Sequence, residues 1–329
     1  MTELQKQILS DLEASGGGFI TGETLSERYG VTRSAVWKAV KVLRASGIHI
    51  EAHTNQGYRI PPMGTLSAEG IIKYLKSADF YDVRYAKSVT STNTILKESA
   101  FRGAAEGTVL AASEQTAGRG RFGRSFISRR GCGVYISFIL RPKGGIDDTV
   151  RITAMAAVAV SQAIETVSGR ETAIKWVNDI CIDGRKTVGI LTEGALDLES
   201  GSIESAVVGI GINILPQDSL PPELKGKVGS VFSSREESDA LDAPNRISAA
   251  LLDNFREMYE SDGGDYMDYY RKKSLVIGRE ITVFPSSAYG GQPGYTAKAI
   301  DIDDRARLLI VKDNGEREWL SSGEVSVRL

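Results

Sequence analysis

The chain has 329 residues, a length that predicts two or three domains rather than one small core. Its 40 basic and 42 acidic side chains give a formal charge of −2, so whole-chain charge does not predict a nucleic-acid partner, although a local cluster can bind one. Two cysteines (Cys132 and Cys181) and two histidines (His49 and His53) are too few for a disulfide framework or a zinc site of Cys and His ligands.

The placement of the histidines limits the chemistry further. Both histidines lie in the first 60 residues. A catalytic centre elsewhere in the chain therefore cannot use Ser-His-Asp chemistry and must rely on Lys, Arg and carboxylates. The N-terminus is polar and helical in pattern and does not resemble a secretory signal. The longest apolar stretch, around 153–160, is too short and too rich in alanine to span a bilayer. We expect a cytoplasmic protein with no membrane partner.

Residues 1–66 have the pattern of three helices and a small hairpin. The first helix has apolar residues at helical spacing, and the second, TLSERYG, is capped by Thr21 or Thr24 and closed by Gly30. The third, within VTRSAVWKAVKVLRASG, stops at Gly47, and IHIEAHTNQGYRI then alternates like two strands around an Asn/Gly turn. This order predicts a winged helix-turn-helix.

The third helix carries basic side chains and no acidic one, as expected of a recognition helix. We expect its exposed residues to lie near the major groove of DNA and the wing at 52–57 to lie near the backbone or minor groove. Trp37 can alternatively be a core residue. A packing module with a solvated basic face is the other interpretation of the whole segment. The candidate DNA-binding residues are Arg33, Ser34, Ala35, Trp37, Lys38 and Lys41.

Residues 67–274 alternate strand and helix patterns. Strands are expected in GTVLAASEQ, GVYISFILRP, TAIKWVND and IESAVVGIGINIL, with a long buried helix in TVRITAMAAVAVSQAIETVSG and a helical segment at 247–270. ICIDGRKTVGILTE predicts a hairpin that turns at Asp183-Gly184. Hairpins among helices favour a mixed α+β sheet. Residues 275–329 predict a small all-β barrel or sandwich of five short strands.

The stretch EQTAGRGRFGRSF, residues 114–126, matches G-x-G-x-x-G at Gly118, Gly120 and Gly123. A dinucleotide fingerprint needs a following helix and an acidic residue about 20 positions on, and this stretch has neither. It is instead an arginine-bearing glycine loop between strands, in which backbone N–H groups and guanidinium groups can bind phosphate. A flexible surface loop is the alternative.

Three further motifs are weaker. KWVND with Lys186 beyond it places two lysines and a carboxylate around a hairpin, which can hold phosphates and a divalent metal at Asp179, or can be simply a solvated hairpin end. The glycines of GIGIN, 209–213, mark either a ligand close to the sheet or tight packing. In STN, 91–93, Ser91 or Thr92 is a candidate helix cap, which is compatible with ligand binding.

Taken together, these motifs resemble the bacterial biotin–protein ligases, specifically the bifunctional class that also represses the biotin operon. The joint order is S-T-N, Q-x-A-G-R-G-R-x-G-R, K-W-x-N-D, R-K-x-x-G-I-L and G-x-G-I-N, and the resemblance covers essentially the whole chain. It implies a winged helix-turn-helix at 1–66, a ligase domain of the class II aminoacyl-tRNA synthetase-like type at 67–274, and an SH3-like small β-barrel at 275–329.

The resemblance also implies roles. Lys186, Arg119, Arg121 and Asp179 would carry the chemistry, with Asp179 also a possible metal ligand. Three departures from the family's common pattern, Thr90, Val177 and Phe126, concern the details of affinity. The residues implied to surround biotin and the nucleotide are Ser91, Thr92, Asn93, Gln115, Gly118, Arg119, Gly120, Arg121, Phe126, Trp176, Asn178, Lys186, Gly189, Gly209, Gly211 and Asn213.

The implied reaction joins biotin to ATP, with Mg²⁺, to give biotinyl-5′-AMP, and then transfers biotin to a lysine of a carrier. The implied partners are the biotin carboxyl carrier protein of acetyl-CoA carboxylase and other biotin-dependent carboxylases, operator DNA, and a second copy in a homodimer, with biotinyl-5′-AMP as corepressor. Three alternatives stay open: a repressor that senses biotinyl-AMP without ligase activity, a lipoate or octanoyl ligase, and a DNA-binding module with a structural C-terminal half.

Overall fold

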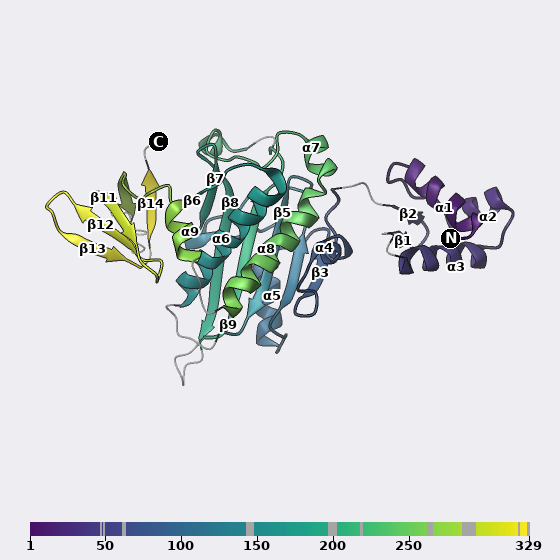
Figure 1. Ribbon diagram of the computed structural model, residues 1–329, viewed down its shortest axis with the longest axis horizontal. Coiled ribbons are helices and arrows are strands. Elements are labelled where there is room, and N and C mark those ends of the chain that lie inside the picture. The colour runs from purple at the N-terminus through teal and green to yellow at the C-terminus, as the bar shows by residue number, and fades with distance from the viewer. Residues whose placement is uncertain are drawn as a thin grey trace. The chain divides into compact units, whose positions relative to one another are not determined.

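The computed structural model describes residues 1–46, 48, 50–60, 64–142, 148–196, 203–217, 220–261, 266–284, 294–321 and 323–327. The chain divides into two compact units, Met1–Thr65 and Leu66–Leu329 (Figure 1). Each unit has its own core, and each is described by itself.

The N-terminal unit is the expected winged helix-turn-helix. It consists of α1 (Glu3–Ala14), α2 (Gly22–Tyr29), α3 (Arg33–Ala45) and the antiparallel hairpin β1 (Glu51–His53) and β2 (Gly57–Arg59). Thr21, rather than Thr24, caps α2, and Gly30 ends it in the left-handed conformation, as predicted. The expected stop at Gly47 lies outside the described residues. The core is aliphatic and comprises Ile8, Leu12, Leu25, Val36, Ala39, Val40, Leu43 and Ile50.

The second unit contains a seven-stranded mixed sheet. Its strands are β3 (Asp82–Ala86), β4 (Thr108–Ala112), β5 (Gly133–Leu140), β6 (Ala173–Lys175), β7 (Asp179–Ile182), β8 (Arg185–Leu196) and β9 (Ile203–Asn213), in the order β3-β4-β5-β9-β8-β7-β6. Among the described strands of this sheet, β3 and β4 pair in parallel and the other neighbours pair antiparallel. The β7–β8 hairpin turns at Asp183 and Gly184, which both have positive φ (49° and 71°), as a type I′ turn requires.

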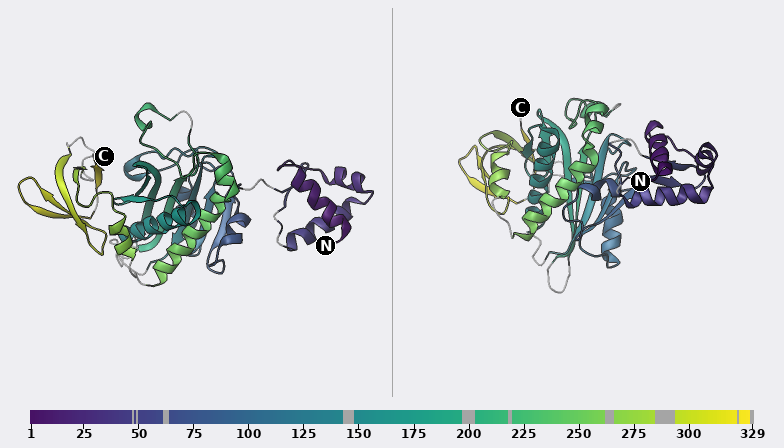
Figure 2. Two further views of the ribbon diagram at one scale, coloured as in Figure 1. Left: turned by 45° about the horizontal axis from the view of Figure 1, so that its top comes forward. Right: turned by 45° about the vertical axis from the view of Figure 1, so that its right-hand side comes forward.

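Helices cover both faces of this sheet. They are α4 (Ala68–Tyr74), α5 (Thr92–Phe101), α6 (Asp148–Ser168), α7 (Arg235–Ala240), α8 (Ala243–Glu260) and α9 (Tyr266–Lys272). The helices α6 and α8 run side by side across one face (Figures 1 and 2). On the other face Leu96 and Ala100 of α5 pack against Ile139, whereas the neighbouring Phe138 enters the main core.

Helix α6 contains the longest apolar stretch of the sequence. Its segment Thr149–Ser168 is long and apolar enough to cross a membrane by length and composition alone. However, 72% of its most apolar window is buried inside the structure, and the helix packs against the sheet and α8. It is therefore the central core helix of this unit.

The five strands expected after residue 275 form one antiparallel sheet. They are β10 (Glu280–Phe284), β11 (Tyr295–Ile302), β12 (Leu308–Lys312), β13 (Arg317–Leu320) and β14 (Glu324–Val327), in the order β13-β12-β11-β10-β14. The boundary at 274/275 stays a prediction, because Leu66–Leu329 form one compact unit.

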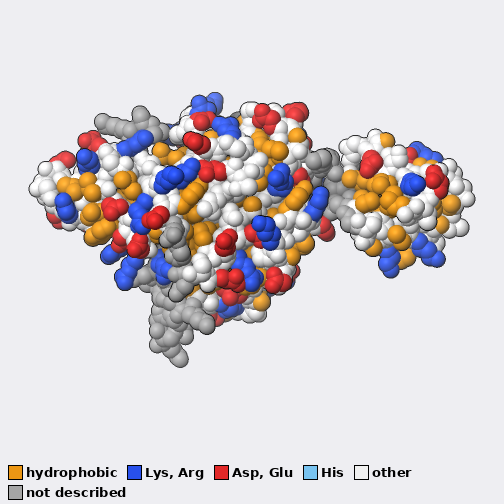
Figure 3. Space-filling model, viewed as in Figure 1, with side chains coloured by type: hydrophobic (Ala, Val, Ile, Leu, Met, Phe, Trp, Pro, Cys, Tyr) orange, Lys and Arg blue, Asp and Glu red, His pale blue; other side chains and the backbone are white. Residues whose placement is uncertain are grey.

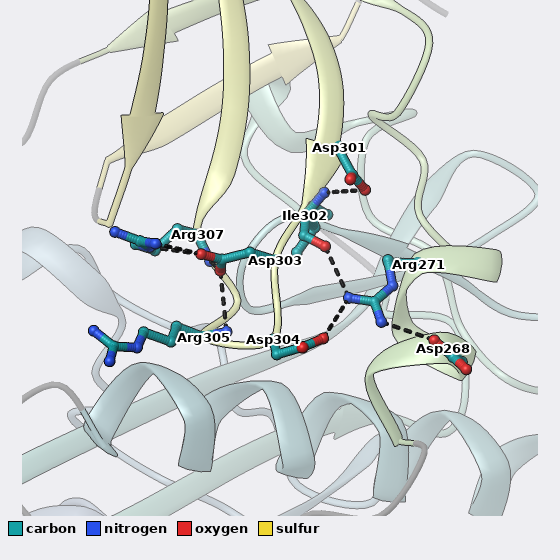
Figure 4. Close-up of polar contacts among 8 residues, drawn as sticks. All are labelled: Asp268, Arg271, Asp301, Ile302, Asp303, Asp304, Arg305 and Arg307. Atoms are coloured by element: carbon teal, nitrogen blue, oxygen red, sulfur yellow. Dashed lines mark hydrogen bonds and ion pairs between the residues drawn. The ribbon is translucent and has the colours of Figure 1, made fainter.

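Polar contacts join this sheet to the part of the unit that contains the seven-stranded sheet. Figure 4 shows Arg271 of α9 donating to the Ile302 carbonyl (3.0 Å) and pairing with Asp304 (2.9 Å) and Asp268 (2.7 Å). The Trp176 indole N–H donates to the Ala306 carbonyl at 2.8 Å. The turn between β11 and β12 is thereby held against the β6–β7 turn, which carries the K-W-x-N-D motif.

Candidate active site

A cavity of about 540 Å³ lies over the β7–β9 part of the sheet. It is lined by nearly every ligand-binding and catalytic residue expected from the sequence; Gly118 alone of that set is not among the lining residues. A Cβ at Gly118 would lie 2.3 Å from the Phe126 carbonyl oxygen, so this glycine permits a close backbone approach inside the loop. The expected residues in the lining are Ser91, Thr92, Asn93, Gln115, Arg119, Gly120, Arg121, Phe126, Trp176, Asn178, Asp179, Lys186, Gly189, Gly209, Gly211 and Asn213.

The S-T-N motif enters the cavity at the start of α5. Ser91, rather than Thr92, is the N-cap, and its hydroxyl accepts from the Thr94 N–H at 3.4 Å. The Thr92 N–H and hydroxyl both donate to Gln115 Oε1, at 2.9 and 3.1 Å. The fully buried Ser137 hydroxyl lies 2.7 Å from Thr92 Oγ1 and from Asn93 Oδ1. These polar side chains therefore have fixed orientations.

Glycines keep the floor of the cavity flat. Gly189 of β8 lies opposite Gly211 of β9 in the ladder, and the Phe126 ring rests on both: a Cβ would come within 2.9 Å of that ring at Gly189 and 2.5 Å at Gly211. At Gly209 a Cβ would lie 1.8 Å from Asn93 Oδ1. Any side chain here would push Phe126 or Asn93 out of place.

The arginine loop, residues 114–126, folds as a tight turn over this floor. The Gly120 N–H donates to the Arg124 carbonyl at 2.7 Å, and Phe122 and Gly123 both have positive φ (56° and 71°). Two arginines reach out of the turn to the sheet. Arg121 donates to Asn178 Oδ1 at 3.0 Å, and Arg119 pairs with Glu193 at 3.2 Å.

Lys186 lies beside Asp179 on the β7–β8 hairpin, with 2.6 Å between Nζ and Oδ1. The Asp179 oxygen is buried, and the contact lacks the angle of a hydrogen bond, so it is an ion pair by proximity. The backbone of Lys186 is fixed on its other side, where its N–H donates to the Lys227 carbonyl and its carbonyl accepts from the Gly229 N–H, both at 2.8 Å. The Lys186 side chain is 40% exposed and accessible to a ligand.

The charge of the cavity is strongly one-sided. Six basic side chains are among its described lining residues, and Asp179 is the single carboxylate; the basic ones are Arg119, Arg121, Arg124, Lys175, Lys186 and Lys227. The surface in Figure 3 shows acidic and basic side chains interspersed instead. Burial raises the pKa of the Cys181 thiol, also in the lining, to about 11, so it is protonated at neutral pH.

Several lining residues were not expected from the sequence. Lys227 belongs to the segment 220–228, which contains the turn η2 (Pro222–Leu224) and no recognisable motif. Gln217 donates to Asn213 Oδ1 at 2.8 Å, and Leu275, Val325 and Ser326 come from the C-terminal part. Trp176 was expected at the ligand; its ring nitrogen is occupied by the Ala306 carbonyl. Lys175, the first residue of the K-W-x-N-D motif, was already a candidate phosphate-binding residue in the sequence.

The candidate DNA-binding residues lie on one face of α3. Arg33, Ser34, Lys38 and Lys41 are exposed and Ala35 is half-buried. Trp37 is 53% exposed, which rules out the core alternative, and Lys41 Nζ lies 5.2 Å from its ring centre. Arg33 forms an ion pair with Glu23 of α2.

Three family models match the chain in the order of its parts. An HTH domain matches residues 4–59, the Biotin/lipoate A/B protein ligase family matches 85–213, and the Biotin protein ligase C terminal domain matches 276–328.

Full-length similarity points to the same family. The chain is 36% identical to the bifunctional ligase/repressor BirA of Bacillus spizizenii over 97% of each chain, and 31% identical to the biotin–[acetyl-CoA-carboxylase] ligase of Mycobacterium tuberculosis over 71% of this chain and 85% of that one. It also resembles the biotin protein ligase from Aquifex aeolicus solved in complex with biotin and ATP, with a TM-score of 0.59 and 28% identity over 76% of this chain and 99% of that one. The chain therefore belongs to the biotin protein ligases, in the family of bifunctional ligase/repressors.

Proposed function

We propose that this protein activates biotin with ATP to biotinyl-5′-AMP, transfers biotin to a carrier lysine, and represses biotin genes when it holds the adenylate. The observation that carries the proposal is the cavity's charge: six basic side chains and one carboxylate surround a neutral glycine floor. Such a cavity suits a ligand with an anionic end, the nucleotide phosphates, and an uncharged ring end, biotin.

The first step needs electrostatic stabilisation rather than a base. A carboxylic acid is already ionised at neutral pH, so biotin's carboxylate oxygen can attack the α-phosphate directly, with pyrophosphate as the leaving group. We assign neutralisation of the phosphate charge to Lys186, Arg119 and Arg121, which lie on two sides of the cavity. Positioning of biotin falls to Asn93 and Gln115, whose side chains are held by hydrogen bonds.

Mg²⁺ fits this cavity as a companion of the phosphates. Among the described residues, three or more His, Cys, Asp or Glu side chains nowhere gather as a metal cluster. A single carboxylate, Asp179, is consistent with Mg²⁺, which commonly binds one or two carboxylates together with substrate phosphates. The ion would neutralise phosphate charge beside Lys186.

The second step requires a neutral amine. The incoming lysine has a reference pKa near ~10.4 and must lose a proton before it attacks the acyl carbon and AMP leaves. Asp179 is our candidate for orienting the amine or accepting its proton, because it is the carboxylate of the described lining. Closure of the arginine loop on the adenylate phosphate would shield the intermediate from water.

For repression, we propose a homodimer on a two-fold operator, with α3 in the major groove. Few basic residues line that face, so binding by one copy alone should be weak. Replacing Lys38 and Lys41 by alanine should weaken operator binding and reduce the salt slope by about one per lost phosphate contact. We further propose that the protein attaches biotin, in the cytoplasm, to the biotin carboxyl carrier protein of acetyl-CoA carboxylase and to other biotin-dependent carboxylases.

The deciding test is ATP- and Mg²⁺-dependent transfer of labelled biotin onto a biotin-carrier domain, with lipoate as a competing substrate and Lys186→Ala alongside. We expect transfer of biotin, none of lipoate, and loss in the variant. Binding of biotinyl-5′-AMP without transfer would instead make the protein a sensor-repressor, and preference for lipoate would move it to the related ligases.

A further inference from the structure

Glu193 of β8 lies outside the lining of the described cavity but contacts two segments that build it, α5 and the arginine loop. Its Oε1 lies 2.8 Å from Lys97 Nζ of α5 and 3.2 Å from Arg119 Nη1 of the arginine loop. Its Oε2 accepts from Asn93 Nδ2 at 3.1 Å. One carboxylate thus touches both the S-T-N motif and the arginine loop.

These contacts form a half-buried cluster around one carboxylate rather than an isolated surface ion pair. The Glu193 side chain is 16% exposed, and both of its oxygens are engaged. Burial by itself would raise the pKa of this carboxyl, but the hydrogen bonds from Lys97 and Asn93 and the charges of Lys97 and Arg119 lower the pKa overall. The group is therefore ionised wherever the ligase works near neutral pH.

Asn93 receives its orientation from this cluster. Its amide nitrogen donates to Glu193 and to the Leu191 carbonyl (3.1 Å), which leaves Oδ1 directed at Ser137 and the backbone of Gly209. An acceptor at Glu193 fixes which end of the amide faces the cavity floor. The same carboxylate holds Arg119, whose side chain is 47% exposed, over the cavity.

We infer that Glu193 is a positioning residue that couples the biotin floor to the arginine loop: it sets the amide of Asn93 and draws Arg119 towards the cavity. The inference rests on the proposed function. Because both contacts share one carboxylate, ordering of Asn93 by biotin and ordering of the loop by the adenylate favour each other. Lys97, 45% exposed and outside the cavity lining, balances the charge of Glu193.

The test compares Glu193→Gln, Glu193→Asp and the matched control Glu204→Gln, whose side chain is exposed on the neighbouring strand β9. The readouts are the KM for biotin and kcat in ATP–pyrophosphate exchange, and the rate of trypsin cleavage in the loop with and without biotinyl-5′-AMP. Glutamine keeps the shape and loses the charge, whereas aspartate keeps the charge and loses reach.

We expect Glu193→Gln to raise the KM for biotin about tenfold, or about 1.4 kcal/mol, and to reduce the protection of the loop by the adenylate. Glu193→Asp should lie between it and the wild type, and Glu204→Gln should match the wild type. A wild-type KM and wild-type protection in both Glu193 variants would overturn the inference, and the aspartate variant alone decides if the glutamine variant does not fold. Absence of ATP–pyrophosphate exchange in the wild type would contradict the proposed function. The affinities of the wild type and the Glu193 variants for biotinyl-5′-AMP, measured by calorimetry, would still test the role of Glu193.

Discussion

The floor of the cavity and the arginine loop above it are built on different principles. The floor consists of β8 and β9, which pair from Val188↔Ile212 to Leu196↔Ile203, and its shape is set by backbone ladders and glycines. The loop is a short turn held by side-chain charge, chiefly through Arg119 to Glu193 and Arg121 to Asn178. The floor is therefore rigid before any ligand binds, whereas the loop depends on where negative charge lies.

This difference assigns a ligand to each region. A flat, neutral floor recognises a ring by shape, and the missing side chain at Gly209 contributes by leaving room for Asn93. A charged loop recognises phosphate by attraction. Without phosphate it is held only by a few side-chain contacts such as Arg119 to Glu193, which are weaker than a backbone ladder. Floor variants should thus affect biotin, and loop variants should affect the nucleotide.

Lys186→Ala should have the largest effect, because Lys186 joins the two regions as a cation on the rigid floor. We expect adenylation to fall on the order of 10²-fold or more, the scale for losing one preorganised electrostatic donor. Single-turnover formation of biotinyl-5′-AMP measures it. The control is Lys225→Ala, because Lys225 is an exposed lysine outside the cavity lining. Near-wild-type adenylation in Lys186→Ala would contradict the assignment of Lys186 to neutralisation of the phosphate charge.

Gly209→Ala tests recognition by shape. The new Cβ would lie 1.8 Å from Asn93 Oδ1, so Asn93 must move. Overpacking of about 1–3 kcal/mol corresponds to a loss of biotin affinity of about 5- to 150-fold, measurable by calorimetry with little change in ATP affinity. Gly194→Ala on the neighbouring strand β8 meets nothing closer than 3.4 Å, so this variant should bind biotin normally. An equal loss of affinity for biotin and ATP in Gly209→Ala would contradict the assignment of biotin to the floor and the nucleotide to the loop.

Arg121→Gln tests recognition by charge. Removing this guanidinium should raise the KM for ATP about tenfold, the scale of one charge-assisted hydrogen bond, and leave the KM for biotin nearly unchanged. The wild-type KM for ATP should also rise with salt more steeply than that of the variant. A change confined to the KM for biotin would instead show that the loop recognises its ligand by shape.

Cys181 should give the smallest effect. With a pKa of about 11 its thiol is protonated at neutral pH, and roughly one molecule in 10⁴ carries the thiolate at pH 7. In a Cys132→Ala background we expect iodoacetamide at pH 7 to leave ligase activity unchanged, with faster inactivation only as the pH approaches 11. Rapid loss at pH 7 would mean that the Cys181 thiol on β7 is more accessible than its burial in the structure indicates.

Local signals predicted much of this architecture because they depend on neighbouring residues. The Asp183-Gly184 pair dictates a type I′ hairpin, and Ser91 caps α5 whatever lies around it. The spacing of Val36, Val40 and Leu43 similarly defines the buried face of α3 and leaves Trp37 outside it.

Contacts between distant segments were beyond such reasoning. Glu193 meets Asn93 across 100 positions, and Trp176 meets Ala306 across 130. A lone acidic residue at the end of a strand pattern carries no sign of its partners. Likewise Phe126 was expected among the residues around biotin and the nucleotide, and nothing in the sequence indicates that its ring rests on Gly189 and Gly211.

Hydrogen–deuterium exchange of the full chain, with and without biotinyl-5′-AMP, tests the central contrast most directly. The account predicts slow exchange of the amides in 203–213 in both states, and exchange in 116–126 that is fast alone and strongly slowed by the adenylate. Equal exchange of the loop in the two states, or a floor that becomes protected only with ligand, would contradict it.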